Sequence, residues 1–174
     1  MVRTIMALLL GGWLLGTLLM AGVATENFLM VDRLLRSPAS ADFQKDVAAL
    51  PPGEARLMLR YLSSELNRFY FRVWEAIELL LSGTLLVLAA AGLKSRKLTL
   101  GISLILAISL VMVFYLTPEL VEVGRRLDFL PRQPPPPELA HFGRLHATYS
   151  ILDLGKLLLG LWVVVALVRH PAPS

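Results

Sequence analysis

The 174-residue chain is too apolar for an ordinary soluble domain of its length, since 56% of its residues are hydrophobic and its mean hydropathy is +0.65. It contains no cysteine, which excludes disulfides, thiolate metal sites and iron–sulfur clusters. Its formal net charge of +4 fits a positive-inside bias or attraction to anionic lipid, and its basic residues lack the aromatic interleaving that would indicate a nucleic-acid partner.

The first apolar stretch covers residues 5–24, roughly the 20 residues that a helix needs to cross a bilayer. Gly12 and Gly16 have the small-xxx-small spacing that lets another helix approach closely, so they are candidates for a homodimer contact. Residues 22–24 resemble a signal-peptidase site, but the apolar run is long for a signal peptide. We therefore expect this segment to be retained.

Residues 25–36 keep helical spacing while turning polar, which predicts that the first helix continues into water. Ser37 and Pro38 indicate a stop and a restart, because serine caps helices and proline suits the first helical position. A short helix through Leu50 should follow, ending at the Pro-Pro-Gly sequence of residues 51–53.

An unbroken helical pattern then runs over residues 54–91. Its second half is apolar, whereas its first half is amphipathic with charges opposite one apolar face. That face comprises Met58, Leu62, Leu66, Phe69 and Val73. Gly92 can end the helix, and residues 94–97 form a tight basic loop.

Residues 98–117 form the third apolar stretch, and Thr117 with Pro118 repeats the combination of a capping residue and a proline. Residues 119–129 are predicted to be a helical extension in water. Residues 131–137 should be an extended linker, because consecutive prolines cannot sustain a helix. The fourth helix begins near Glu138 and should leave the membrane at Arg169 and His170.

The sequence therefore predicts one all-α domain over residues 1–174, an integral membrane four-helix bundle with helices extended into water on one side. The predicted spans are residues 5–24, 73–92, 98–117 and 149–168, and the extramembrane helical layer covers 25–72 and 118–148. The short loop 94–97 carries three cations, so the positive-inside rule predicts an inner (cytoplasmic) membrane protein with both termini in the cytoplasm.

The fourth helix carries a polar stripe that lipid would reject. At about 100° per residue, one face holds His146, Tyr149, Ser150, Asp153 and Lys156. Counting back from the cytoplasmic ends places polar residues of the other helices at the same level, namely Glu26, Asn27, Arg72, Glu75, Glu78, Tyr115, Thr117 and Glu119. We expect the stripe to face the bundle interior and to meet Glu75 or Glu78.

Asp153 and Lys156 lie deepest on this stripe. An unpaired charge in hydrocarbon costs about 2.5–3.5 kcal/mol on insertion scales, and a pair three residues apart offsets that cost. The pair is either a clamp that fixes helix packing or part of a proton or ion relay with His146 and Tyr149. The clamp is favoured, because no ionisable residue lies deeper to continue a path.

Residues 142–153, Phe-Gly-Arg-Leu-His-Ala-Thr-Tyr-Ser-Ile-Leu-Asp, resemble the F-x-x-LH-x-x-S-x-x-x-N signature of the transmembrane protein 205-like family, a domain of unknown function. Residues 114–120 look like that family's Y-x-x-P end of the third helix, and residues 67–71 are weakly similar to its entry into the second. Tyr149 stands in place of a small polar residue and Asp153 in place of asparagine, so a charged version of the site, paired with Lys156, is expected here. The resemblance implies a four-helix integral membrane protein.

Two metal-dependent alternatives follow from single residue types. The family's layout is similar to that of four-helix proteins of copper resistance and porphyrin oxidation that use membrane histidines, so His146 is a candidate haem or porphyrin ligand, with a methionine or a second subunit completing the site. A di-iron site would need two Glu-x-x-His motifs, and only Glu138-x-x-His141 exists. Ser150 has no oxyanion donor or strained elbow that would indicate a nucleophile.

The function expected from the sequence is non-enzymatic: an accessory subunit of a membrane complex, or a protein that handles a small ligand or ion, with the lipid bilayer and other membrane subunits as partners and no cofactor or metal. The alternative is a redox protein that binds haem, another porphyrin or copper. The candidate polar-network or ligand-binding residues are His146, Tyr149, Asp153, Lys156, Glu75, Glu78, Arg72 and Asn27.

Overall fold

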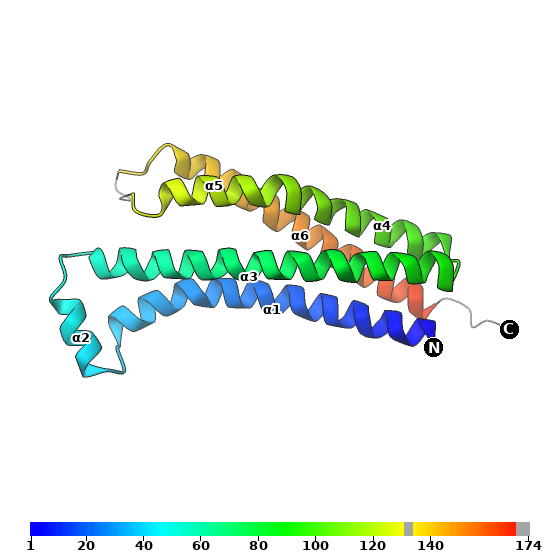
Figure 1. The fold of residues 1–174 in the computed structure, drawn as a ribbon, viewed down its shortest axis with the longest axis horizontal. Coiled ribbons are helices and arrows are strands. Elements are labelled where there is room, and N and C mark those ends of the chain that lie inside the picture. The colour runs from blue at the N-terminus through cyan, green and yellow to red at the C-terminus, as the bar shows by residue number, and fades with distance from the viewer. Residues whose placement is uncertain (131–133, 170–174) are drawn as a thin grey trace.

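The computed structural model describes residues 1–130 and 134–169, and all regular structure within those ranges is helical. The elements in chain order are α1 (Val2–Arg36), α2 (Ala41–Ala48), α3 (Glu54–Val87), the π-helical turn η1 (Leu88–Gly92), α4 (Arg96–Val111), the π-helical turn η2 (Met112–Leu116), α5 (Thr117–Leu127) and α6 (Glu138–Val168). Because η1 continues α3, and η2 joins α4 to α5, the chain forms four long helices: α1, α3 with η1, α4 with η2 and α5, and α6. The short helix α2 connects α1 to α3 (Figure 1).

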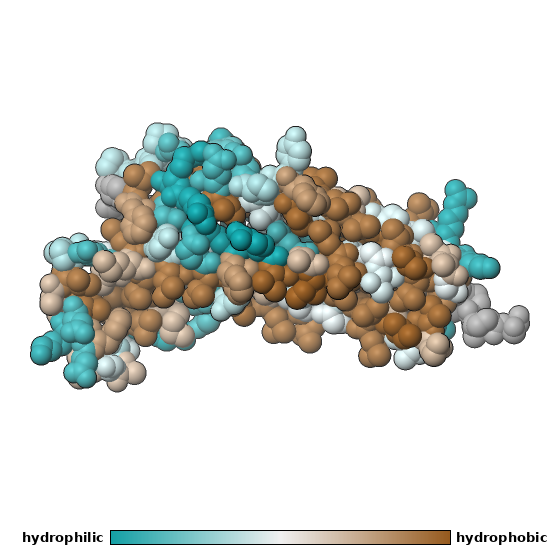
Figure 2. All heavy atoms as spheres, in the orientation of Figure 1, coloured by the Kyte–Doolittle hydropathy of each residue, from teal (hydrophilic) through white to brown (hydrophobic). Residues whose placement is uncertain are grey.

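The four long helices form the predicted bundle. In it, α1 packs against α3 and α6, and α4 packs against the same two helices from the other side. Each long helix is long and apolar enough to cross a membrane. Large apolar side chains cover the outer surface, among them Leu8, Leu80 and Leu158, which are 72%, 71% and 60% exposed (Figure 2). So extensive an apolar surface is typical of contact with lipid.

Two of the helices are much longer than a bilayer is thick. α1 has 35 residues and the continuous helix Glu54–Gly92 has 39, which at 1.5 Å per residue gives about 52 and 58 Å against a hydrocarbon core of about 30 Å. The predicted helical continuation through residues 25–36 and from residue 54 is therefore confirmed. The extensions lie at the end of the bundle that holds α2, opposite the N-terminus and the last turn of α6 (Figure 1).

Capping differs from the sequence prediction at two places. Ser37 ends α1, as expected, but the new helix starts at Ala41, because the side chain of Ser40 accepts a hydrogen bond from the Phe43 backbone N–H at 3.3 Å. Thr117 makes no cap, and its hydroxyl donates to the Glu75 carboxylate instead. The chain passes from α4 into α5 without a break through η2, which lies just before Pro118. A π-helical turn accommodates the missing proline N–H and the bulk of its ring.

The predicted proline-rich linker is only partly within the described residues. Residues 131–133 lie outside them, and residues 134–137 form a bend and a turn that lead into α6. The fourth helix begins at Glu138, as predicted, and ends at Val168 with Arg169 as its C-cap. His170 lies outside the described part of the chain.

Each of the three tryptophans packs on a glycine of a neighbouring helix. A Cβ added at Gly16 would overlap the ring of Trp74, one at Gly160 the ring of Trp13, and one at Gly101 the ring of Trp162. These contacts join α1 to α3, α1 to α6, and α4 to α6. Gly16 is thus used within the chain, whereas Gly12 has open space around it. The homodimer contact suggested by their spacing stays a prediction.

The glycine contacts yield a stability prediction. Gly160→Ala should lower the free energy of unfolding by about 1–3 kcal/mol, because the added methyl group collides with Trp13, which is 1% exposed and cannot swing outward. Gly155→Ala on the same helix is the matched control, since its Cβ would meet nothing within 4 Å, and removing a helical glycine stabilises by up to about 1 kcal/mol. Thermal unfolding of the detergent-solubilised variants measures both. Equal midpoints for the two variants would contradict the role of the Trp13 contact.

Candidate functional site

A buried ion pair lies at the centre of the bundle. Lys156 Nζ on α6 is 2.6 Å from Glu78 Oε1 on α3, and their side chains are 1% and 3% exposed. The indole N–H of Trp13 on α1 donates to the same carboxylate oxygen at 3.1 Å. Because both charges are removed from water, each depends on its partner for compensation. One carboxylate thus links three helices.

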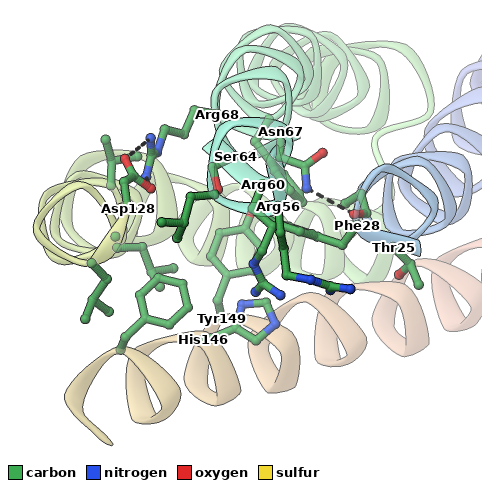
Figure 3. Close-up of a pocket in the computed structure, with 18 of the residues that line it drawn as sticks. Thr25, Phe28, Arg56, Arg60, Ser64, Asn67, Arg68, Asp128, His146 and Tyr149 are labelled. Atoms are coloured by element: carbon green, nitrogen blue, oxygen red, sulfur yellow. Dashed lines mark hydrogen bonds and ion pairs between the residues drawn. The ribbon is translucent and has the colours of Figure 1, made fainter. Parts of the chain in front are cut away.

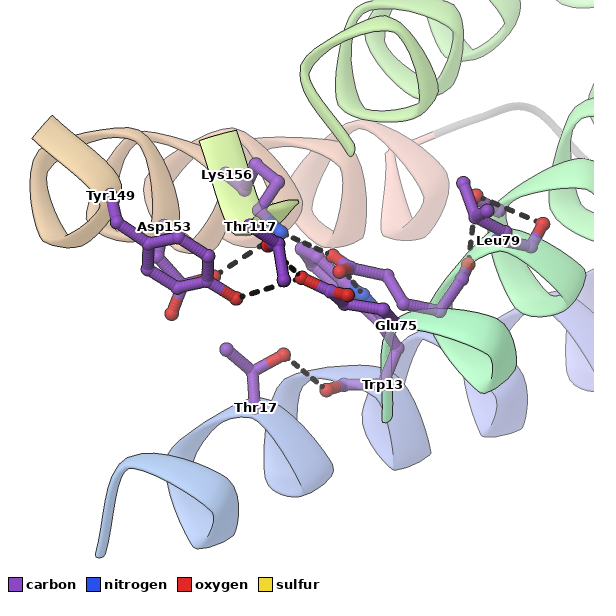
Figure 4. Close-up of polar contacts among 10 residues, drawn as sticks. Trp13, Thr17, Glu75, Leu79, Thr117, Tyr149, Asp153 and Lys156 are labelled. Atoms are coloured by element: carbon purple, nitrogen blue, oxygen red, sulfur yellow. Dashed lines mark hydrogen bonds and ion pairs between the residues drawn. The ribbon is translucent and has the colours of Figure 1, made fainter. Parts of the chain in front are cut away.

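Further polar groups surround this pair (Figure 4). Asp153 Oδ1 lies 3.2 Å from Lys156 Nζ, with its side chain 26% exposed. Glu75, one turn from Glu78, accepts a hydrogen bond from the Thr117 hydroxyl, and the Tyr149 hydroxyl lies 3.5 Å from the same Glu75 oxygen. We call these residues the buried polar cluster: Trp13, Glu75, Glu78, Thr117, Tyr149, Asp153 and Lys156.

The structure brings together part of the predicted stripe. Tyr149 and Lys156 face the interior and meet Glu75 and Glu78, as predicted. Asp153 does contact Lys156, but the closer and more deeply buried partner is Glu78. A clamp within α6 was therefore too narrow an interpretation, since the main pair joins two helices.

Other predicted site residues lie elsewhere. His146 is exposed and stacks on Phe142, with ring centroids 6.1 Å apart. The Ser150 hydroxyl donates to the backbone oxygen of His146 at 2.9 Å, so it does not act on the imidazole. Arg72 is exposed. Asn27 donates to Asn67 Oδ1 at 2.6 Å and forms a separate bridge between α1 and α3.

Sequence reasoning missed Trp13 and Asn67. Trp13 lies in an apolar stretch, where its indole N–H was the one feature that suggested a buried acceptor. Asn67 also donates to the backbone oxygen of Ala24 at 3.0 Å, and Ser63 donates to that of Asn27 at 2.9 Å. These bonds attach the first half of α3 to α1 through polar groups. This half of α3 lies in the half of the bundle nearest α2, which we call the outer half (Figure 1).

A cavity of about 710 Å³ occupies the outer half of the bundle (Figure 3). All four long helices contribute to its walls. Its apolar lining includes Phe28, Leu57, Phe71, Leu120, Leu127 and Phe142, and its polar lining includes Arg56, Arg60, Ser64, Asn67, Arg68, Asp128, His146 and Tyr149. A mostly apolar hollow of this size with a few polar groups is typical of a small-molecule site.

The outer half of α3 is turned so that its polar face borders this cavity. The predicted apolar face is outside, with Met58, Leu62 and Phe69 50%, 54% and 59% exposed. The Arg68 guanidinium binds Asp128 through two hydrogen bonds of 2.8 Å, and it also binds Glu65 at 2.6 Å. This bidentate pair braces α3 against the end of α5.

Two other arginines that line the cavity, Arg56 and Arg60, take no part in the Arg68–Asp128 pair. Arg56 pairs with Asp32 of α1, and the Arg60 guanidinium lies 5.6 Å from the ring centroid of Phe28. Asp32 also interacts electrostatically with Arg36 and Arg60, so one acidic group serves three cations. This part of the cavity carries an excess of positive charge.

A narrower cleft of about 280 Å³ lies between α1, α3 and α6. It shares five lining residues with the cavity, namely Ala24, Thr25, Phe71, His146 and Tyr149. From there it passes Met20, Trp74 and Leu157 and reaches Asp153 of the buried polar cluster. The cavity and the cleft therefore adjoin each other and share part of their walls.

Metal-ligating side chains do not converge in the part of the chain that the structure describes. There, no group of three or more histidine, aspartate or glutamate residues is placed to hold a metal ion. His141, from the single Glu-x-x-His motif, lies 3.4 Å from Glu119.

Comparison with known proteins adds no relative. No family model matches the chain, and neither a curated protein nor a solved structure is significantly similar to it. The resemblance to the transmembrane protein 205-like family stays a prediction.

The buried ion pair can be tested by a double-mutant cycle. Lys156→Met should lower the free energy of unfolding by about 3–5 kcal/mol, because it leaves Glu78 buried without its counter-charge. Asp153→Asn should lower the free energy of unfolding much less, because Lys156 still pairs with Glu78 in that variant. Thermal unfolding of each variant in detergent is the measurement.

Glu78→Gln combined with Lys156→Met should recover most of the loss, because removal of both charges of a buried pair is often nearly neutral. A double variant as unstable as Lys156→Met alone would show that Glu78 is not the main partner of Lys156.

Proposed function

We propose that this protein is a non-enzymatic membrane protein that binds a small organic ligand in the cavity of its outer half. The observation that carries the proposal is the 710 Å³ hollow with walls from all four long helices. Its size falls within the range of about 300–1,000 Å³ that small-molecule sites occupy. Its few polar groups converge from different helices, which is how a site fixes the orientation of a ligand.

The buried polar cluster supports this function because it borders the cavity at its inner end. Tyr149 and Thr117 belong both to the cluster and to the cavity lining. Because the cluster links α1, α3, α5 and α6, it holds the wall residues at fixed positions. Binding sites built on rigid elements are better organised than sites on loops.

A role as an accessory subunit is compatible with ligand binding. The exposed apolar face around Met58, Leu62 and Phe69 extends beyond the predicted membrane boundary near residue 73. Such a surface suits lipid or the apolar surface of another membrane subunit. We therefore keep the lipid bilayer and a neighbouring subunit, or a second copy of the chain, as proposed partners.

A haem, another porphyrin or copper is the second candidate ligand. His146 and Met20 both line the narrow cleft, so one chain offers a histidine and a methionine to a single hollow. The absorption spectrum and metal content of purified protein decide between the candidates. A Soret band that disappears in His146→Ala would establish the porphyrin and overturn the organic ligand as the main occupant.

The cavity itself is tested by filling it. Ser64→Trp introduces a bulky ring into the lining and should abolish retention of bound small molecules, as detected by native mass spectrometry and organic extraction of the purified protein. Met58→Trp is the matched control, because Met58 lies on the same helix with its side chain exposed outside the cavity. Equal retention by both variants would contradict a site in the cavity.

We also propose an inner-membrane location with both termini in the cytoplasm. The N-terminus, the last turn of α6 and the basic turn between η1 and α4 lie at one end of the bundle (Figure 1), where Gly92 packs near Val2. The positive-inside rule assigns that end to the cytoplasm.

This orientation predicts a labelling pattern. Because the chain has no cysteine, a single Ala39→Cys or Ser95→Cys gives a unique thiol at each end. An impermeant maleimide applied to intact cells should label Cys at position 39 and leave position 95 unlabelled until the cells are opened. The reverse pattern would place the termini outside.

A further inference from the structure

We infer that the ligand is a single-chain amphiphile with an anionic carboxylate or phosphate head, which is held by Arg56 and Arg60 while its chain lies in the cleft between α1 and α6. This inference rests on the function proposed above and names the class of ligand. It depends on the charge of the cavity, on the shape of the two adjoining hollows and on where the cleft opens.

The charge of the cavity selects the head group. Arg68 is committed to Asp128 and Glu65. Arg56 pairs with Asp32, and the same carboxylate also faces Arg60 and Arg36. Guanidinium groups bind carboxylate and phosphate through paired N–H donors. Arg56 and Arg60 lie one helical turn apart on α3, so both can reach one head group from the same wall.

The shape of the hollows selects the rest of the molecule. The cavity is mostly apolar, with a few polar groups that include these arginines, and it adjoins a cleft with less than half its volume. The cleft walls include Met20, Trp74, Leu154 and Leu157. A narrow apolar cleft attached to a wider basic cavity fits one hydrocarbon chain below one acidic head.

The cleft also gives the hydrocarbon chain of the ligand a route from the bilayer. Ala21, Ser150 and Leu154 line it and are exposed at the surface of the bundle, between α1 and α6. Besides His146, Tyr149, Asp153 and small hydroxyl groups, the walls of the cleft are apolar. A membrane lipid or a free fatty acid can therefore enter sideways with its chain in lipid and its head toward the cavity.

Trp74 can report the position of the ligand's hydrocarbon chain, because it lines the cleft and packs on Gly16. The probe is a fatty acid with bromine atoms on its chain, added to protein in a neutral detergent. Bromine quenches tryptophan at short range, so the probe should quench fluorescence saturably. Trp74→Phe, which keeps an aromatic ring on Gly16, should remove that component. Trp162, which is 47% exposed, reports non-specific partitioning.

The head group is tested with two charge-matched double variants. Arg56→Gln with Arg60→Gln should weaken binding of the brominated acid roughly tenfold or more, the size expected when charge-assisted contacts are lost. Arg33→Gln with Arg126→Gln removes the same charge from exposed arginines outside both hollows and should bind normally. Exposed ion pairs contribute little to folding, so both doubles should remain folded.

Three ligand arms identify the source. The brominated acid, the corresponding lysolipid with a phosphate head and the corresponding neutral monoacylglycerol are compared on wild-type protein. Tighter binding of the phosphate arm points to a membrane lipid and of the carboxylate arm to a fatty acid, and either result supports the inference.

Equal binding of the neutral arm, or no effect of the Arg56 and Arg60 double, overturns the anionic head. Saturable quenching that persists in Trp74→Phe overturns the placement of the hydrocarbon chain. Both results leave the cavity as a site, whereas binding of every arm to Ser64→Trp as well as to wild type would refute the proposed function itself.

Discussion

The ion pair between Lys156 and Glu78 is the constraint on which the rest of the bundle depends. Two charges that are almost fully withdrawn from solvent must remain in contact, because separating them would leave each one unpaired in a low-dielectric interior. The contact fixes the position of α6 along the axis of α3. The indole N–H of Trp13 on α1 donates to the same Glu78 oxygen, so α1 is held at the same level. The contacts between the tryptophans and glycines reinforce this alignment through apolar packing. Together they set one register.

That register explains why the outer half of the bundle can stay hollow. Beyond the cluster, the helices are held by polar bridges between neighbours, with Arg68 and Asp128 joining α3 to α5 and Asn27 and Asn67 joining α1 to α3. Such bridges occupy the walls and do not fill the space between them. The polar residues of α3 therefore face inward around a cavity, while its apolar residues face outward.

Helical periodicity predicted the long helices, their extensions and the inward direction of Tyr149 and Lys156, because these depend on spacing within one helix. The true partner of Lys156 was harder to identify. Asp153, three residues away, is visible as a neighbour in the sequence, but Glu78 becomes one only through the register of α3 against α6. For the same reason Thr117 was interpreted as a cap when it donates across to Glu75. The cavity arises from four helices together, so no local pattern indicates it.

The seam between α1 and α6 is asymmetric along its length. At the inner end it is closed, because Trp13 packs on Gly160 and the guanidinium of Arg3 donates to the carbonyl of Val168. Farther out the same two helices border the open cleft. Closure at one end holds the helices together while the other end stays accessible. The proposed route along this seam therefore requires no helix to unpack. The buried polar cluster borders the cleft through Tyr149 and Asp153, so we expect it to keep its register when a ligand occupies the cleft.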